Sequence, residues 1–325
     1  MQSSRRQKFR YRFGNHILQT ERPLVSISES IEPDSYSTIF ITEISHDAVT
    51  TISRGQLVWI DSNASFSVWL SDGAYFIQFD ELAGFELLLE QSTIRIHRPH
   101  ETMDETIEHL LLDQVLPRFL SKTGEIVLHA SAIAQNGLSV AFLGESGAGK
   151  STLSASFAGE ATLLTDDALV TMCSGTSAEV IPTYPTLRLC TASIQGLFEN
   201  PPSTMQMAQY STKRRLTSKS HVPTVHGTFE LACCFLINRN PAGSNVSIES
   251  IGQKQACMTF VKSMFQLDPT NRTTMEHTLN SAIKLSELVP VYLLNYPHEF
   301  DRLSQVREAV KDCLGKRASH YGTQR

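Results

Sequence analysis

Apolar residues recur at every second position in several short segments of the first hundred residues. Phe66, Val68 and Leu70 form one such series, and this period of two is typical of a strand with two different faces. The segments are rich in β-branched and aromatic residues and are separated by turn residues; they are STIFITEI, QLVWI, SFSVWL and AYFIQF. We therefore expect residues 1–102 to form a β-rich, antiparallel N-terminal domain. Its role, in substrate binding or in assembly, is left open by the pattern.

The period changes to that of a helix after this domain. Apolar residues recur there at intervals of three and four, which predicts an amphipathic helix. Pro117 is expected to stop or kink this helix because proline has no backbone N–H to donate. The apolar positions are Met103, Ile107, Leu110, Leu111 and Val115.

From about residue 125, short apolar strands alternate with helical segments. IVLHASAIA is expected to be one strand and LSVAFLG a second, followed by a helix at KSTLSASFA and a strand at ATLLT. This alternation favours an α/β domain, which we place at residues 103–315 and follow with a polar tail at 316–325. Further strands are expected at ALVTM, PTLRLC, LACCFLIN, VSIES and VPVYLLN, and further helices at QKQACMTFVKSMF, Met275–Leu288 and FDRLSQVREAVKDCL.

Composition and charge exclude several classes of protein. Of 325 residues 41% are hydrophobic, and 28 Lys and Arg against 33 Asp and Glu give a net charge of −5. These values argue against a disordered chain and against a dedicated nucleic-acid binder. No apolar run is long enough for a membrane span, and the basic start of the chain has no apolar segment behind it that would make it a secretory signal. The six cysteines lack metal-ligand spacing and suit a reducing compartment, so we expect a cytoplasmic protein.

The strongest chemical signal is the segment GESGAGKS, which begins at Gly144 and lies between a predicted strand and a predicted helix. It matches the G-x-x-x-x-G-K-[ST] pattern, whose glycines let backbone N–H groups surround phosphate oxygens. Lys150 would reach the β- and γ-phosphates, and the Ser151 hydroxyl would ligate Mg²⁺. The residues expected to hold the nucleotide are Gly144, Ser146, Gly147, Ala148, Gly149, Lys150, Ser151 and Thr152.

Two adjacent carboxylates, Asp166 and Asp167, follow the predicted strand ATLLT, about 16 residues after Lys150. Strand ends of an α/β sheet deliver side chains to the ligand crevice, so these carboxylates are expected beside the phosphate loop. One would hold Mg²⁺ and the other would accept a proton from an attacking hydroxyl. A turn in which an aspartate caps the chain is the structural alternative.

Basic residues and one histidine complete the candidate site. His129 lies in the apolar strand before the phosphate loop, where a core histidine is the alternative. Arg188 is flanked by leucines, so its charge needs a partner such as a phosphate or a carboxylate. Lys213 and Arg214 lie in the stretch Glu199–Gly227, which is polar, contains three prolines and has no periodicity. Such a stretch is a lid, a binding loop or a disordered segment, and its cations either neutralise a transferring phosphoryl group or are simply solvated.

Taken together, the segment LHASAIAQNGLSVAFLGESGAGKSTLSASFAGEATLLTDDALV resembles the catalytic core of the HPr kinase/phosphorylase superfamily. Members have a strand with a histidine, a G-x-S-G-x-G-K-[ST] loop, a helix, and a strand that ends in Asp-Asp. The later YPTLRLC and a Lys-Arg pair resemble the shorter HPr-kinase-like proteins, among them the lasso peptide kinases. The resemblance covers residues 125–190 and, more loosely, 100–315. It implies a P-loop kinase core like the C-terminal domain of HPr kinase, preceded by the β-rich domain.

The resemblance carries over to individual residues. It implies that the phosphate loop binds ATP, that Asp166 and Asp167 are the metal and base carboxylates, and that His129 lies beside them. Lasso peptide kinases phosphorylate the C-terminal serine of a precursor peptide, and HPr kinases are hexameric, so a peptide acceptor and self-association are implied as well. The E-x-R-G-x-G segment and the C-terminal basic signature of HPr kinases are absent from this sequence. Their absence favours a specialised kinase over a bifunctional enzyme.

We therefore expect a phosphotransferase that uses ATP and Mg²⁺ to phosphorylate a serine hydroxyl. Asp167 is expected to be the base, Ser151 and Asp166 the Mg²⁺ ligands, and His129 a residue that orients the base or contacts the phosphate. Arg188, with Lys213 or Arg214, would stabilise the phosphoryl oxygens. A small-molecule kinase, a non-catalytic ATP-binding regulator and a P-loop ATPase are the alternatives. An acceptor with a serine hydroxyl is expected, and neither nucleic acid nor a membrane.

Overall fold

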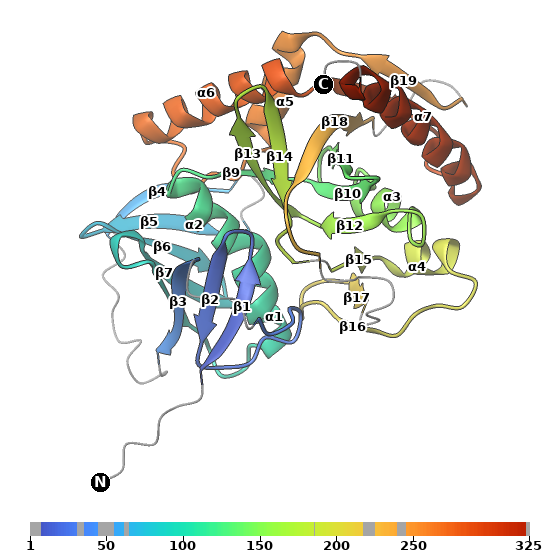
Figure 1. The fold of residues 1–325 in the computed structure, drawn as a ribbon. Coiled ribbons are helices and arrows are strands. Elements are labelled where there is room, and N and C mark those ends of the chain that lie inside the picture. Colours follow the sequence, from blue (N-terminus) through green and yellow to red (C-terminus); the bar gives the residue numbers. More distant parts are fainter. Residues whose placement is uncertain are drawn as a thin grey trace. The chain divides into compact units, whose positions relative to one another are not determined.

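The structure is a computed structural model, which describes residues 8–30, 36–44, 55–61, 65–184, 186–216, 225–238 and 245–322. Contacts divide the chain into two compact units. Residues 1–124, 207–211 and 266–275 make up unit 1, and residues 125–206, 212–265 and 276–325 make up unit 2. The protein is a mixed α/β protein with several sheets (Figure 1).

Unit 1 is built on an eight-stranded sheet in the order β1-β2-β3-β8-β7-β6-β5-β4. The β2–β3 and β3–β8 pairs are parallel and the other pairs are antiparallel. The expectation of an antiparallel domain was therefore correct only in part. The strands are β1 (Phe9–Phe13), β2 (His16–Thr20), β3 (Ser37–Ile44), β4 (Gln56–Ile60), β5 (Ser67–Ser71), β6 (Ala74–Phe79), β7 (Ala83–Leu88) and β8 (Thr93–His97), with a 3₁₀ turn at Leu89–Gln91.

A long helical segment covers part of this sheet. It runs as α1 (Asp104–Leu110), a π-helical turn (Leu111–Val115) and α2 (Leu116–Lys122). The guanidinium of Arg118 lies 4.4 Å from the centre of the Phe66 ring, and Nζ of Lys122 lies 5.1 Å from the centre of the Tyr75 ring. The sequence placed this segment at the start of the second domain, whereas its contacts place it in unit 1.

Unit 2 contains a nine-stranded sheet in which β12-β10-β11-β18-β14-β13-β9 are neighbours, while β20 pairs with β18 and β19. Its strands are β9 (Ile126–His129), β10 (Ser131–Gln135), β11 (Leu138–Leu143), β12 (Thr162–Thr165), β13 (Ala168–Ser174), β14 (Ser177–Ile181), β18 (Phe229–Ile237), β19 (Ser247–Ser250) and β20 (Val291–Asn295). A separate three-stranded sheet has the order β15 (Arg188–Leu189), β17 (Arg214–Leu216) and β16 (Thr204–Gln206). The predicted strand IVLHASAIA is thus two strands, which meet at Ala130.

Helices pack against both faces of the large sheet. Along β11, Val140 and Phe142 belong to one buried cluster, and Ala141 and Leu143 to another, because successive strand residues point to opposite faces. The first cluster also contains residues of α3 (Lys150–Ser156), α4 (Thr191–Leu197) and α7 (Leu303–Gly322), which a 3₁₀ turn at Phe300–Arg302 precedes. The second contains residues of α5 (Gln253–Ser263) and α6 (Arg272–Leu288). Helix α7 extends into the expected polar tail. None of the described helices is long and apolar enough to cross a membrane.

Candidate active site

The segment GESGAGKS, which the sequence predicts to bind phosphates and which we call the phosphate loop, connects strand β11 to helix α3. Three of its glycines have positive φ angles, +149° at Gly144, +79° at Gly147 and +96° at Gly149. L-residues with a side chain rarely adopt such angles, so the wrapped backbone depends on glycine. A Cβ atom at Gly144 would also lie 3.0 Å from Cβ of Ala148. The loop therefore has a conformation that a side chain at these positions would disturb.

The ammonium group of Lys150 folds back over this loop. Lys150 is only 5% exposed, and its Nζ donates to the carbonyl oxygens of Gly144 (2.8 Å) and Glu145 (3.2 Å). Burial lowers the pKa of Lys150, the charges of Asp167 and Asp166 oppose that shift, and Lys213 adds to it. The same lysine is thus held by the loop and lies within electrostatic reach of both aspartates.

The other predicted loop residues have different surroundings. Ser151 is close enough to the Asp166 carboxyl for its hydroxyl to lower the pKa of that group. The Thr152 hydroxyl instead pairs with the Ser193 hydroxyl of α4 at 2.8 Å. Ser146 is exposed at the tip of the loop, and Ala148 is buried beneath it. The structure therefore places Ser151, but not Thr152, beside a carboxylate.

Asp166 and Asp167 form the whole connection between β12 and β13. Asp167 has φ +84°, a left-handed conformation that aspartate tolerates better than most residues. Its carbonyl oxygen accepts a hydrogen bond from the N–H of Ala130 (3.2 Å), and Ala168 is the strand partner of His129. The sharp turn thus holds the two aspartates beside Ala130, the residue between β9 and β10.

His129 and Arg188 flank the carboxylate of Asp167. His129 Nε2 lies 3.8 Å from Asp167 Oδ1, and Arg188 Nη2 lies 3.3 Å from Asp167 Oδ2. Arg188 also donates from its backbone N–H to Asp166 Oδ2 (3.3 Å) and from Nη2 to the backbone carbonyl of Asp166. Because Arg188 is 1% exposed, these carboxylates supply the partner that its buried charge needs. The structure thus brings together the predicted residues His129, Asp166, Asp167 and Arg188.

The pKa values of the two neighbouring aspartates shift in opposite directions. Burial raises the pKa of Asp166 to about 6, and the negative charge of Asp167 adds to the rise. Burial acts in the same direction on Asp167, but the positive charges of Arg188, His129, Lys213 and Lys150 outweigh it and hold the pKa well below the usual range. Asp167 is therefore ionised at neutral pH, whereas burial and the charge of Asp167 disfavour the ionised form of Asp166.

The donor atoms near Asp166 fit a magnesium ion. Asp166 Oδ1 is buried and accepts no hydrogen bond of ordinary length from the described residues. Together with the Ser151 hydroxyl it offers the oxygen ligands that Mg²⁺ prefers, and Mg²⁺ usually takes only one or two protein carboxylates beside substrate phosphates. Among the residues that the structure describes, no three His, Cys, Asp or Glu side chains are grouped to hold a metal by themselves.

Lys213 and Arg214, the two basic residues predicted for the site in the polar stretch, have different surroundings. Lys213 is half-buried and influences the pKa of Asp166, Asp167 and Lys150. Arg214 is exposed and donates from Nε to the Thr204 hydroxyl (2.6 Å) and from Nη2 to its carbonyl (3.2 Å). Strand residues alternate between faces, so the structure does not bring Arg214 to the carboxylates. The stretch also contains β16 and β17, where the sequence predicts no regular structure; residues 217–224 of it lie outside the described ranges.

Sequence reasoning missed the residues that support the predicted ones. The Tyr184 hydroxyl lies 3.4 Å from Arg188 Nη1, and the Phe265 ring packs edge-on against the His129 ring at 5.7 Å between centroids. Tyrosine and phenylalanine are common in any core, so the sequence gives no signal that Tyr184 and Phe265 lie beside the site. Arg215 was not missed: the sequence groups it with Lys213 and Arg214 as a basic residue of the polar stretch, and the structure makes it the 2% exposed strand partner of Arg188.

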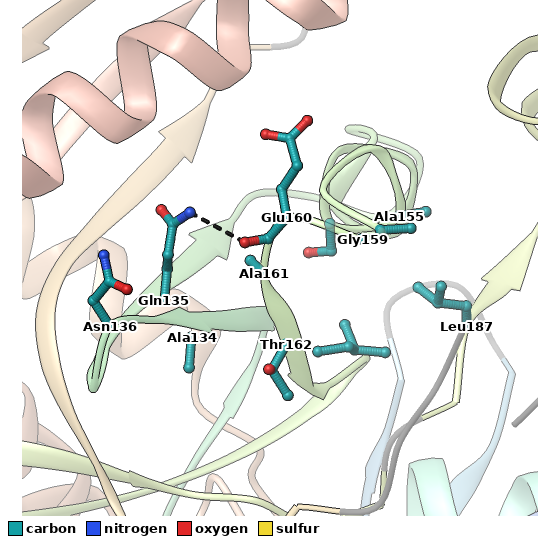
Figure 2. A pocket seen from close by; sticks show the side chains of 12 residues that line it. Ala134, Gln135, Asn136, Ala155, Gly159, Glu160, Ala161, Thr162 and Leu187 are labelled. Atoms are coloured by element: carbon teal, nitrogen blue, oxygen red, sulfur yellow. Dashed lines mark hydrogen bonds between the residues drawn. The ribbon is translucent and has the colours of Figure 1, made fainter. Parts of the chain in front are cut away.

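A different cavity of about 380 Å³ lies at the far end of α3 (Figure 2). Gln135 Nε2 donates to the Glu160 carbonyl oxygen (3.1 Å) at its rim, and the Glu160 side chain pairs with Arg307 and Lys311. None of the predicted nucleotide-binding or catalytic residues is among its lining residues. This cavity is therefore separate from the candidate site.

No family model matches the chain, and no curated protein matches it. Among solved structures, it is similar to the Hpr(Ser) kinase/phosphatase from Coxiella burnetii, with 13% sequence identity and a TM-score of 0.30. The match covers 58% of this chain and 97% of that one. At that TM-score the likeness carries no argument about activity.

Proposed function

We propose that the protein is a kinase that transfers the γ-phosphoryl group of ATP to a serine hydroxyl. One observation carries the proposal: Lys150 of the phosphate loop, the two aspartates, His129, Arg188 and Lys213 form a single electrostatic cluster. A loop that binds phosphates, next to an ionised carboxylate and several cations, supplies the positioning and charge stabilisation on which phosphoryl transfer depends.

Asp167 is the carboxylate that we assign to the acceptor. Its side chain is 17% exposed, whereas that of Asp166 is fully buried, so only Asp167 is open to an approaching hydroxyl. It would orient the hydroxyl and take its proton as the oxygen attacks phosphorus. A low pKa suits this role, because the loose transition state of phosphoryl transfer needs little prior activation of the nucleophile. His129 and Arg188 would hold the carboxylate in place.

Asp166 and Ser151 are the residues that we assign to Mg²⁺. The ion, when bound, would neutralise charge on the phosphate oxygens. Lys150 would hold the β- and γ-phosphates, and Lys213 would place a further positive charge near the transferred group. The bond from the γ-phosphorus to the bridging oxygen breaks, ADP leaves, and the new bond joins phosphorus to the serine oxygen.

For the acceptor we propose a peptide serine, and the C-terminal serine of a lasso precursor peptide is the first candidate, on the basis of the sequence resemblance. Intact-mass spectrometry after incubation with ATP and Mg²⁺ tests it, with a panel of peptides that end in serine, HPr and free serine. A gain of roughly 80 Da, one phosphoryl group, is expected on a peptide. A gain on free serine alone would assign the protein to small-molecule metabolism instead.

Asp167→Asn is the decisive variant for this panel. It keeps the size of the side chain and removes its negative charge, so transfer should fall by at least about a hundredfold while ATP binding persists. Lys150→Ala should weaken both transfer and binding. Full activity of Asp167→Asn would exclude the proposed base, and ATP binding that is unchanged in Lys150→Ala would exclude the phosphate loop as the nucleotide site.

A further inference from the structure

Three parallel strands of unit 2 end side by side around the phosphate loop. Strand β11 pairs in parallel with β18, and β18 with β20. Their carboxyl ends lead into the phosphate loop at Gly144, into Asn238, and into Tyr296 and His298 respectively. Ligands of α/β sheets bind at the carboxyl ends of parallel strands. The residues after β18 and β20 are therefore placed to contact whatever the phosphate loop holds.

Tyr296 and His298 form a flat aromatic stack at this edge. Their ring centroids are 4.7 Å apart and their planes differ by 3°. Tyr296 is 3% exposed, whereas His298 is exposed. His298 Nε2 donates to the Asn238 carbonyl oxygen (3.0 Å), which fixes the orientation of the ring. An exposed imidazole is thus held with one face on a buried tyrosine and its Nε2 on the Asn238 carbonyl oxygen.

The stack touches the phosphate loop. A Cβ atom at Gly149 would lie 3.4 Å from the Tyr296 hydroxyl oxygen and 4.0 Å from His298 Nδ1. Gly149 directly precedes Lys150, the residue assigned to the β- and γ-phosphates. A cavity of about 460 Å³ borders the same loop, lined by Gly144, Ala148, Ile237 and Asn238 among others. Asn238 belongs to this cavity and also accepts the hydrogen bond that orients His298.

We infer that His298 is the stacking surface for the base of the bound nucleotide, with Tyr296 as its support. The inference rests on the proposed function, because it takes a nucleoside triphosphate to be held by the phosphate loop. Stacking recognises the π-face that every base has, and the larger area of a purine favours it over a pyrimidine. The site would thus bind purine nucleotides more tightly than pyrimidine nucleotides and would discriminate little between adenine and guanine.

The test compares a ligand that has a base with one that has none. Dissociation constants for ATP and for inorganic tripolyphosphate, both with Mg²⁺, are measured by calorimetry on the full chain. His298→Ala should weaken ATP binding about tenfold, as expected for the loss of one base stack, and should leave tripolyphosphate binding unchanged. His298→Phe should restore ATP binding, because a phenyl ring stacks without the imidazole nitrogens. GTP should bind the wild-type protein within about tenfold of ATP.

Two controls separate this inference from the proposed function. His277 is an exposed histidine of α6, so His277→Ala should change neither constant. Lys150→Ala should weaken both ligands, since both have the phosphates. If Lys150→Ala weakens both but His298→Ala weakens neither, or weakens both equally, the stacking role is wrong and the phosphate site stands. If neither ligand binds the wild-type protein, the proposed function is wrong and this inference with it.

Discussion

The backbone of Asp167 lies in a region that few residues with a side chain adopt. At φ +84° the residue is part of the turn that links β12 to β13 and presents its carboxylate to His129 and Arg188. Such conformations cost about 1–3 kcal/mol and are found most often at functional sites. At the scale of the residue, the turn and the proposed chemistry thus depend on the same aspartate.

Replacing Asp167 by two different uncharged residues separates these two contributions. Both Asp167→Asn and Asp167→Ala remove the charge, but alanine tolerates a left-handed backbone less well than asparagine. We expect Asp167→Ala to be less stable than Asp167→Asn by about 1 kcal/mol, and both to be inactive. Urea unfolding of the two variants measures the difference. Equal stabilities would show that the turn imposes no strain on this residue.

Asp268 of unit 1 is a buried carboxylate that accepts hydrogen bonds from its own loop and from Tyr75 of β6. Its Oδ2 accepts from the Tyr75 hydroxyl (2.7 Å), and Oδ1 accepts from the Thr270 hydroxyl (2.7 Å) and from the N–H groups of Thr270 and Asn271 (both 3.1 Å). Burial acts to raise the pKa of Asp268, but these hydrogen bonds and Lys122 prevail and lower it. The folded state therefore binds a proton less readily than the unfolded state.

This shift predicts how stability depends on pH. The contribution of Asp268 is fully present above its unfolded pKa, near 3.9, and is lost as the pH falls through the folded pKa. We expect Asp268→Asn to lower the free energy of unfolding by about 1–3 kcal/mol at pH 7. The difference from the wild-type protein should shrink below about pH 4. Urea titrations at pH 7 and pH 3 measure both values, and a difference that is the same at both would contradict the assignment.

At the scale of the element, the start of strand β17 determines which basic side chain lies near the aspartates. Lys213 precedes the strand and lies near Asp166 and Asp167, while Arg214 is bound to Thr204. The sequence alone cannot choose between them, because two adjacent basic residues in a polar stretch have the same local pattern. The alternation of side chains becomes known only once the pairing of β17 with β15 and β16 is known.

Lys213→Ala and Arg214→Ala form a matched pair for this distinction. Removal of the positive charge near the transferred group should lower the transfer rate by about a hundredfold or more for Lys213→Ala. Arg214→Ala should change it less than about threefold, because surface substitutions have small effects. Single-turnover measurements with saturating ATP compare the two rates. A larger loss of rate for Arg214→Ala than for Lys213→Ala would mean that Arg214, and not Lys213, acts on the transferred group.

The helical segment of unit 1 contains a proline, Pro117, that does not end the helix. Pro117 is predicted to stop or kink the helix at 103–116, and the structure shows that it does not stop it, because helical residues continue to Lys122. A π-helical turn at Leu111–Val115 precedes the proline and accommodates the missing N–H, as such turns often do. The proline by itself predicts that the helix is interrupted. The burial of Leu116 and Phe119, both 2% exposed or less, favours a helix that continues past it.

Pro117→Ala should therefore have a small effect on stability. Removal of a proline from an undistorted helix interior would gain about 3 kcal/mol. Here the turn already fits the ring, so we expect a change within about 1 kcal/mol in urea unfolding. Leu116→Ala, a neighbouring change in the core, should lower stability by about 2–5 kcal/mol and serves as the control. A large gain from Pro117→Ala would show that the π-helical turn stores strain.

At the scale of the whole molecule, the sequence predicts the site residues that lie close together along the chain. It does not predict those that come from distant segments. The phosphate loop and the aspartates lie within one short segment, and the structure places them together as expected. Tyr296 and His298 are far away in the sequence, and their position depends on β20 pairing with β18. The parallel pairs of β2, β3 and β8 likewise depend on distant partners, which no local period identifies.

The path of the chain has consequences for any fragment. It passes between the two units at residues 124/125, 206/207, 211/212, 265/266 and 275/276. Fragment 1–124 therefore lacks Leu267 and Asp268, which accept hydrogen bonds from Trp59 and Tyr75 at 2.7 Å each. We expect this fragment to show no cooperative urea transition, because part of its core and of its hydrogen-bonding partners is missing. A sharp transition would show that the later segments are dispensable.

The same path bears on synthesis. Domains usually fold as units in the order in which they leave the ribosome, the N-terminal one first. Unit 1 contains residues from both ends of a span that runs to residue 275, so it cannot be completed while only its first 124 residues have been made. Its sheet would have to wait for Gln266–Met275 with Trp59 and Tyr75 still unpaired. During translation the nascent chain thus has an incomplete β-rich unit until residue 275 has been made.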